Sequence, residues 1–314
     1  MSIKSKIVFV AFLFLAVSCG GRKKAEPAVQ DRAFPQPTVP TAYTDPAERL
    51  EYLVSHYWDD FFAGDGRTDS ARVIGVPKTG VEQAMANYIA VLNEAPLSQA
   101  QKGMSHLFDQ LSAKQQADTS QRVYLAMTEM VAHYLYDPNS PVRDEDLYLP
   151  FVQKMAASPL TREDMRTAYR YEAQMCALNP RGSIAPDFVI TLRNGTTVRM
   201  HSVKADKTLL FFSNPGCNNC KEIIDALQAD EYARQLVRDG NLAVLNVYID
   251  EDLKAWRDYM PTYPREWLNG YDAAHILRQD LLYCIRAIPS LYLLDADKRV
   301  LLKDAPLDRV LQVL

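Results

Sequence analysis

The chain has 314 residues, of which 48% are apolar and 24% are charged. At about 150 residues per domain, this length predicts two domains, each long enough to bury its own core. The composition excludes a disordered or fibrous chain. A net charge of −4 gives no sign of a nucleic-acid-binding protein. Five cysteines are too few for a disulfide scaffold of this size.

Residues 1–18 have the pattern of a secretory signal peptide. Lys4 and Lys6 form a basic start, and the unbroken apolar run Ile7–Val17 follows. As a helix, this run rises about 16 Å, which is too short for a bilayer core of roughly 30 Å. We therefore expect a cleaved signal over 1–18, not a membrane span.

The signal ends in Ala16-Val17-Ser18-Cys19, which resembles a bacterial lipobox. The resemblance implies that Cys19 becomes the lipid-modified mature N-terminus and anchors the protein to a lipid bilayer. A plain signal peptide cut after Ser18 is the alternative. Residues 19–43 are rich in proline and lack periodicity, so we interpret them as an extended linker.

Residues 44–180 have the 3.6-residue apolar period of helices. Asp45 is a predicted N-cap, Pro46 a predicted first helical residue, and an apolar face runs from Leu50 to Phe61. Further stripes extend to Cys176 and predict five or six helices in a bundle. We therefore expect an all-α helical domain, and no motif in it assigns a function.

Two features of this domain involve residue types that can bind a metal or react as a thiol. His56 and Asp60 stand four residues apart, a spacing that can hold a metal. They fall on the polar face, so we interpret them as a solvated surface pair. Cys176 lies on an apolar stripe and is interpreted as a small core residue.

Residues 181–314 alternate between predicted strands and helices. A β-hairpin with an Asn194-Gly195 turn comes first, and apolar strands over 208–212 and 242–249 follow. Residues 251–282 are read as two helical stretches. The pattern closes with strands over 288–295 and 299–302 and a helix from Leu307. This order predicts an α/β domain in which helices flank a central mixed sheet.

Cys217-x-x-Cys220 directly follows the strand 208–212 and opens a helical pattern. A helix N-terminus offers unpaired N–H groups and the positive end of the helix dipole, and both stabilise a thiolate. One turn later the second sulfur lies on the same face and can attack a mixed disulfide. The predicted roles are nucleophile for Cys217 and resolving thiol for Cys220.

The segment Tyr283–Leu291 resembles the cis-proline region of thioredoxin, and Ala185–Phe188 precedes the hairpin as in the TlpA/ResA-type periplasmic thioredoxins. The whole mature chain is similar to Bacteroides-type lipoproteins that place an uncharacterised helical domain before such a module. The resemblance implies a thioredoxin-like fold, a cis Ile288–Pro289 bond, and a substrate peptide bound at Ile288 and Pro289.

The same resemblance implies a periplasm-facing thiol–disulfide oxidoreductase that acts on protein cysteines. It needs no cofactor besides the redox-active Cys217–Cys220 disulfide. Its partners are protein thiol or disulfide substrates and a membrane redox partner. The reductase direction is favoured over oxidation, and the membrane that holds the lipid stays open between inner and outer.

Several positions depart from the family pattern. Gly216 stands where a tryptophan usually precedes the first cysteine, and Phe211 and Asn246 stand where the family has a buried acid and its lysine partner. The proton acceptor for Cys220 is therefore not identified, and Asp250 and Glu251 are candidates.

Other interpretations of the cysteines stay open. A zinc site is disfavoured because a lone C-x-x-C supplies only half of the ligands. A static Cys217–Cys220 disulfide would make the chain a non-catalytic binding lipoprotein that uses a degenerate thioredoxin fold as a scaffold. A peroxidase is disfavoured because the surroundings of Cys217 lack its usual motif. Cys284 is either inert packing or a third thiol near the site.

Overall fold

A computed structural model describes residues 31–314, and Arg32–Leu314 form one compact unit. The predicted signal peptide over 1–18 and the predicted lipidation site Cys19 lie outside the described residues. No helix among residues 31–314 is long and apolar enough to cross a membrane.

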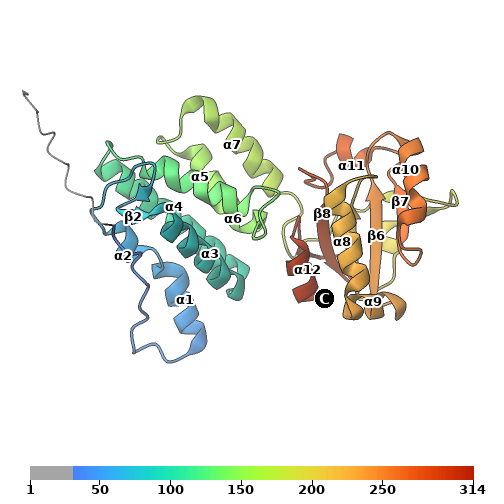
Figure 1. Ribbon diagram of the computed structural model, residues 1–314, viewed down its shortest axis with the longest axis horizontal. Helices are drawn as coiled ribbons and strands as arrows, with labels where there is room; N and C mark the ends of the chain where they lie inside the picture. Colours follow the sequence, from blue (N-terminus) through green and yellow to red (C-terminus); the bar gives the residue numbers. More distant parts are fainter. Residues whose placement is uncertain (1–30) are drawn as a thin grey trace, which may run out of the picture. The chain divides into compact units, whose positions relative to one another are not determined.

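The first part of the chain is helical, as predicted (Figure 1). Its helices are α1 (Pro46–His56), α2 (Asp59–Phe62), α3 (Lys78–Glu94), α4 (Leu97–Ala117), α5 (Val123–Leu135), α6 (Glu145–Ala157) and α7 (Glu163–Cys176). They enclose one apolar core that includes Trp58, Phe61, Tyr88 and Phe151. The predicted cap of α1 is confirmed, because the Asp45 carboxylate accepts a hydrogen bond of 2.7 Å from the Ala47 N–H.

The helix predicted to run through Phe61 is divided in two. The helix α1 ends at His56, and α2 begins at Asp59. The break accompanies burial of the adjacent side chains Phe61 and Phe62 in the same core.

The helix α6 has no counterpart among the predicted apolar stripes. Pro150 lies inside it, and proline has no N–H to donate to the carbonyl four residues earlier. That carbonyl belongs to Asp146, and it accepts a hydrogen bond of 3.0 Å from the Gln101 side chain instead. The neighbouring helix α4 thus satisfies the acceptor that the proline leaves open.

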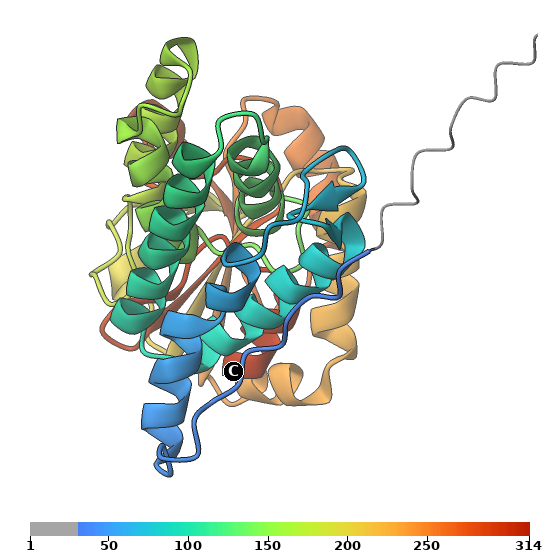
Figure 2. The same ribbon diagram turned by 90° about the vertical axis from the view of Figure 1, so that its left-hand side faces the viewer.

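Two further features of the helical part were not predicted. The strands β1 (Arg72–Val73) and β2 (Val76–Pro77) form a short antiparallel hairpin. Within the predicted linker 19–43, Arg32 donates to Gly75 O and Phe34 stacks on Phe61 at a centroid distance of 5.4 Å. Figure 2 shows residues 31–43 (blue) as an extended coil along the helices.

The second part is built on a seven-stranded mixed sheet, as expected. Its strand order is β4-β3-β7-β6-β5-β8-β9. The strands are β3 (Val189–Leu192), β4 (Thr197–Arg199), β5 (Lys207–Phe212), β6 (Leu242–Tyr248), β7 (Leu268–Tyr271), β8 (Ser290–Asp295) and β9 (Val300–Leu302). β5 pairs with β6 in parallel and with β8 in antiparallel orientation. The predicted β3–β4 hairpin is confirmed, with Gly195 at φ 81° in its turn.

Side chains alternate between two cores across this sheet. Leu209 and Phe211 face one core, and Leu210 and Phe212 face the other. The helices of this part are α8 (Asn218–Ala229), α9 (Glu231–Arg238), α10 (Leu253–Tyr259), α11 (Ile276–Gln279) and α12 (Leu307–Val313). Buried residues of α8, α9, α10 and α12 belong to the first core, and Leu277 of α11 belongs to the second.

The helical prediction for residues 251–282 missed the strand β7. It is short, contains a glycine and lacks the apolar alternation of a strand. Pairing with β6 and β3 holds it in the sheet. A Cβ at Gly270 would lie 2.9 Å from Thr191 O, so this close strand approach requires glycine.

Candidate functional site

The two cysteines of the C-x-x-C motif lie at the N-terminus of α8, as predicted. Cys217 is the N-cap residue, and its sulfur accepts a hydrogen bond of 3.2 Å from the Cys220 N–H. Both cysteines are free thiols. Cys217 is half-buried, whereas only 2% of Cys220 is exposed. The geometry presents one sulfur to a substrate and keeps the other behind it.

The turn between β5 and α8 explains one departure from the family pattern. Gly216 has φ 72°, in the left-handed region that residues with a Cβ adopt only at a cost. The backbone conformation here favours glycine at the position where the family usually has tryptophan.

The Ile288–Pro289 peptide bond is cis, as expected, and lies beside the dithiol. Ile288 O is 4.0 Å from Cys217 Sγ. The sheet register explains this proximity, because Phe212 at the end of β5 pairs with Ser290 at the start of β8. The loop that enters β8 and the turn that leaves β5 therefore lie side by side, at the same end of these two strands.

Cys220 is held in its neutral form. Burial and the hydrogen bond with Cys217 raise the pKa of Cys220 to about 12. At neutral pH it is a thiol, and it must lose its proton before it can act as a nucleophile.

An apolar side chain, Phe211, and a neutral amide, Asn246, lie where the family has a buried ion pair. Phe211 is fully buried against Trp267, and its cross-strand partner Asn246 bonds to Ser213 and Asn269. The Tyr263 hydroxyl is buried close to Ser213 and Asn246, and burial raises its pKa to about 12.

The two candidate proton acceptors differ in their surroundings. The Asp250 carboxylate is 2.5 Å from both Arg278 Nη1 and Asn214 Nδ2, so it is already engaged. Glu251 is exposed. The sequence did not single out Tyr263, because only the fold places it near Cys220.

The remaining described cysteines are buried at a charged cluster. Cys176 is fully buried, as predicted, and burial raises its pKa. Cys284 is 3% exposed, and its thiol donates to Glu145 Oε1 over 3.6 Å. Burial raises the pKa of Cys284 to about 12. These observations favour inert packing over a third reactive thiol.

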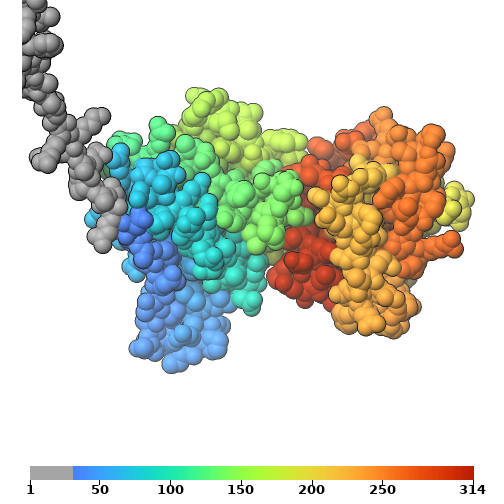
Figure 3. Space-filling model, viewed as in Figure 1, coloured from blue at the N-terminus to red at the C-terminus, as the bar shows by residue number. Residues whose placement is uncertain are grey.

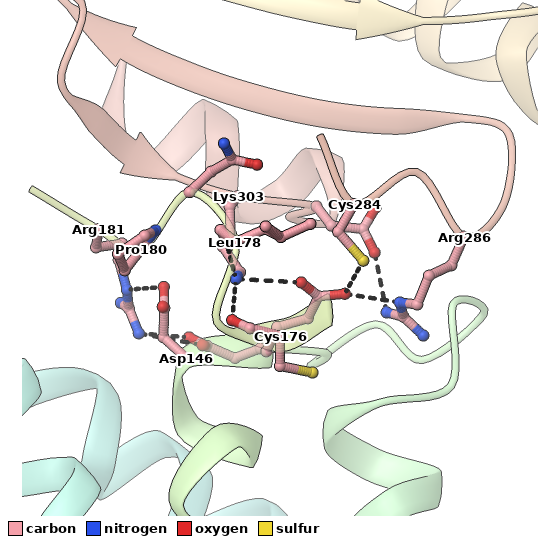
Figure 4. Close-up of polar contacts among 12 residues, drawn as sticks. Asp146, Cys176, Leu178, Pro180, Arg181, Cys284, Arg286 and Lys303 are labelled. Carbon is pink, nitrogen blue, oxygen red and sulfur yellow. Dashed lines mark hydrogen bonds and ion pairs between the residues drawn. The ribbon is translucent and has the colours of Figure 1, made fainter. Parts of the chain in front are cut away.

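Glu145 is the centre of this cluster and is 1% exposed. Its carboxylate lies 2.6 Å from Arg286 Nε and 3.3 Å from Lys303 Nζ. Lys303 also donates to Cys176 O and Leu178 O (Figure 4). The cluster links α6 and α7 of the helical part to the loop before Pro289 and to the loop after β9. No sequence signal marked Glu145.

His56 and Asp60 are both exposed, as predicted for a solvated surface pair, but His56 contacts Asp59 and not Asp60. His56 Nδ1 lies 2.7 Å from Asp59 Oδ2, three residues further along the chain. Within residues 31–314 no group of three histidine, cysteine, aspartate or glutamate residues is placed to hold a metal ion.

The fold and dithiol define a thioredoxin-like protein with an added helical part. A family model described as a domain of unknown function (DUF5106) matches residues 17–179, and the chain belongs to this family. None of the curated proteins matches the chain.

Solved structures match both parts. A thioredoxin-like protein from Bacteroides caccae ATCC 43185 is 35% identical, with a TM-score of 0.74; the match covers 90% of this chain and 98% of that one. The C-terminal domain of an uncharacterized protein from Bacteroides fragilis NCTC 9343 is 42% identical over 43% of this chain and 97% of its own, with a TM-score of 0.42.

A third structure is the thioredoxin domain of a thiol-disulfide oxidoreductase from Bacteroides vulgatus. It is 20% identical over 43% of this chain and 97% of its own, with a TM-score of 0.38.

Proposed function

We propose that this chain is a thiol–disulfide oxidoreductase that acts on protein cysteines. The observation that carries the proposal is the position of Cys217: an N-cap sulfur, half-exposed, 4.0 Å from Ile288 O and directly in front of the buried Cys220. The match to a thioredoxin-like protein over 90% of the chain supports it.

The reaction proceeds in two exchanges. The Cys217 thiolate attacks one sulfur of a substrate disulfide, the S–S bond breaks, and the other substrate sulfur leaves as a thiolate that takes up a proton. Cys220 then loses its proton and attacks Cys217 Sγ. The mixed disulfide breaks, the Cys217–Cys220 disulfide forms, and the second substrate thiol is released. The substrate gains two electrons and the protein loses them.

We further propose the setting in which this chemistry occurs. Cys19 carries a lipid, and the protein faces the periplasm as a lipoprotein of the TlpA/ResA type. A membrane dithiol partner returns the two electrons to Cys217–Cys220, and reduction of substrates is the favoured direction. Fatty-acid labelling that is lost in Cys19→Ala tests the anchor. A reduction potential near the thioredoxin value of about −270 mV would support the direction.

Trapping tests the exchange itself. In Cys220→Ser the first mixed disulfide cannot be resolved, so we expect covalent adducts through Cys217 that disappear on reduction. Cys217→Ser should form none, and Cys220→Ser/Cys284→Ser should trap as well as Cys220→Ser alone. If Cys220→Ser forms no adduct with either proteins or small disulfides, the chain is a scaffold for binding and not an exchange enzyme.

A further inference from the structure

A cavity of about 390 Å³ lies beside the dithiol and has walls from both parts of the chain. The helical part contributes Pro138, Asn139 and Arg143, and the thioredoxin-like part contributes residues of α8, the cis-proline loop and the start of α12. Figure 3 shows the green surface of the helical part against the red C-terminal residues, next to the gold surface of α8. A volume of this size is typical of ligand pockets.

The cavity lies next to the reacting sulfur, although Cys217 is not part of its lining. Ile288 lines it, and the carbonyl of the same residue is 4.0 Å from Cys217 Sγ. Asn219, two residues after Cys217, lines it as well. A protein segment bound to Cys217 through a disulfide therefore has this cavity next to its cysteine.

Arg143 fixes the helical wall of the cavity. Its side chain is 10% exposed, and it donates to Asp304 O over 2.8 Å and to Ala305 O over 3.2 Å. A third hydrogen bond, to Ser140 O, ties the guanidinium to its own turn. The turn that carries Pro138 and Asn139 is thereby fastened to the loop that leads into α12.

Arg286 fastens the same turn to the cis-proline loop. It stands three residues before Pro289, donates to Tyr136 O, and lies 4.0 Å above the Tyr136 ring. Burial of charged groups is a weak source of stability but can define one arrangement. The contacts of Arg143 and Arg286 hold the helical wall of the cavity in position before any substrate binds.

The residues that line the cavity indicate which kind of substrate side chain it binds. Pro138, Ile223 and Leu307 present apolar surface. Of the two charged residues in the lining, Arg143 lies 3.7 Å from the Asp304 carboxylate, whereas Glu222 is exposed. This combination suits an apolar side chain next to the substrate cysteine and disfavours an acidic one.

We propose that the helical part recognises the substrate: the cavity binds the residues that flank the reactive cysteine of an extended protein segment, with an apolar residue beside that cysteine. The proposal rests on the exchange activity proposed above. It gives the domain of unknown function a role that the dithiol alone does not require.

A single-exchange assay separates recognition from chemistry. In the Cys220→Ser background, Cys217 attacks the peptide sulfur of a peptide–thionitrobenzoate disulfide; the peptide–Cys217 bond forms, and the coloured thiolate leaves with the electron pair. The mercaptoethanol–thionitrobenzoate disulfide has the same leaving group but no flanking residues. The measured quantity is the ratio of the two rate constants.

Asn139→Trp is designed to fill the cavity from an exposed turn, and Gln116→Trp is the matched control on the exposed surface of α4. With a leucine-flanked peptide, we expect the ratio to fall about tenfold in Asn139→Trp and to stay within about twofold in Gln116→Trp. Glu222→Lys should raise the ratio for an aspartate-flanked peptide by roughly threefold or more.

The outcomes distinguish the two proposals. If mercaptoethanol–thionitrobenzoate does not react with Cys217, the proposed exchange activity fails. If it reacts but Asn139→Trp changes the ratio by no more than twofold, the exchange activity stands and recognition by the helical part is overturned, whatever the result for Glu222→Lys.

Discussion

Arg286 and Glu145 form a buried ion pair of 2.6 Å, with the arginine three residues before the cis-proline and the carboxylate on the first turn of α6. Cys284 and Lys303 contact the same carboxylate. The pair connects the loop beside the reacting sulfur to a helix that lies more than a hundred residues earlier in the chain.

Glu145→Ala should strongly destabilise the protein. It leaves the buried Lys303 without a carboxylate and leaves Arg286 with Asp304 alone. Breaking such a buried pair typically costs about 3–5 kcal/mol. Urea unfolding measures the loss. Lys154→Ala removes a more exposed ion pair with Asp109 and should cost below about 1 kcal/mol. Equal losses in the two variants would contradict the importance of the buried cluster.

Asp304 should make stability depend on pH. Burial and the nearby Glu145 carboxylate raise the pKa of Asp304 to about 6. The folded protein therefore holds this proton more tightly than the unfolded chain, and the stabilising contribution is lost as pH rises from about 4 through 6. At about 1.4 kcal/mol per pKa unit, the loss amounts to roughly 3 kcal/mol.

The measurement compares the free energies of unfolding of the wild type and Asp304→Asn between pH 4 and pH 7.5. The difference between the two isolates Asp304 from other titrating groups. We expect the wild type to lose stability relative to the variant as pH rises across this window. A difference that stays flat would show that Asp304 titrates alike in the folded and unfolded states.

Gly216→Ala should cost about 1 kcal/mol, because φ 72° is strained for alanine. Nothing lies within 4 Å of the added Cβ, so backbone strain is the expected cause. Gly80→Ala in α3 serves as the control, since alanine favours a helix and the nearest atom is 3.4 Å away. Urea unfolding should show a loss only for Gly216→Ala; no loss there would exclude strain at this turn.

Gln101 and Pro150 should be energetically coupled. Gln101→Leu leaves the buried Asp146 carbonyl without its donor, at a cost of about 1–3 kcal/mol. Pro150→Ala restores an N–H within the helix, so Gln101→Leu should cost less in that background. A double-mutant cycle of unfolding free energies measures the coupling, and strict additivity would contradict it.

The sequence predicted what depends on local pattern. The N-cap Asp45, the Asn194-Gly195 turn and the placement of Cys217 at a helix start follow from short-range rules, and the structure confirms them. The cis bond at Pro289 came from family resemblance.

What the sequence missed depends on contacts between distant segments. The strand β7 exists because β3 and β6 flank it, and α6 tolerates Pro150 because Gln101 supplies a donor. Glu145 has no motif around it, and its partners Arg286 and Lys303 lie more than a hundred positions further along the chain. No local period or spacing contains that information.

The burial of Cys220, Cys176 and Cys284 has a practical consequence for the half-exposed Cys217. In the native fold of residues 31–314, an alkylating dye should modify Cys217 first and report on it alone among these four thiols. The other three become reactive when the fold opens. One fluorophore can therefore be placed beside the cis-proline without replacing any other described cysteine.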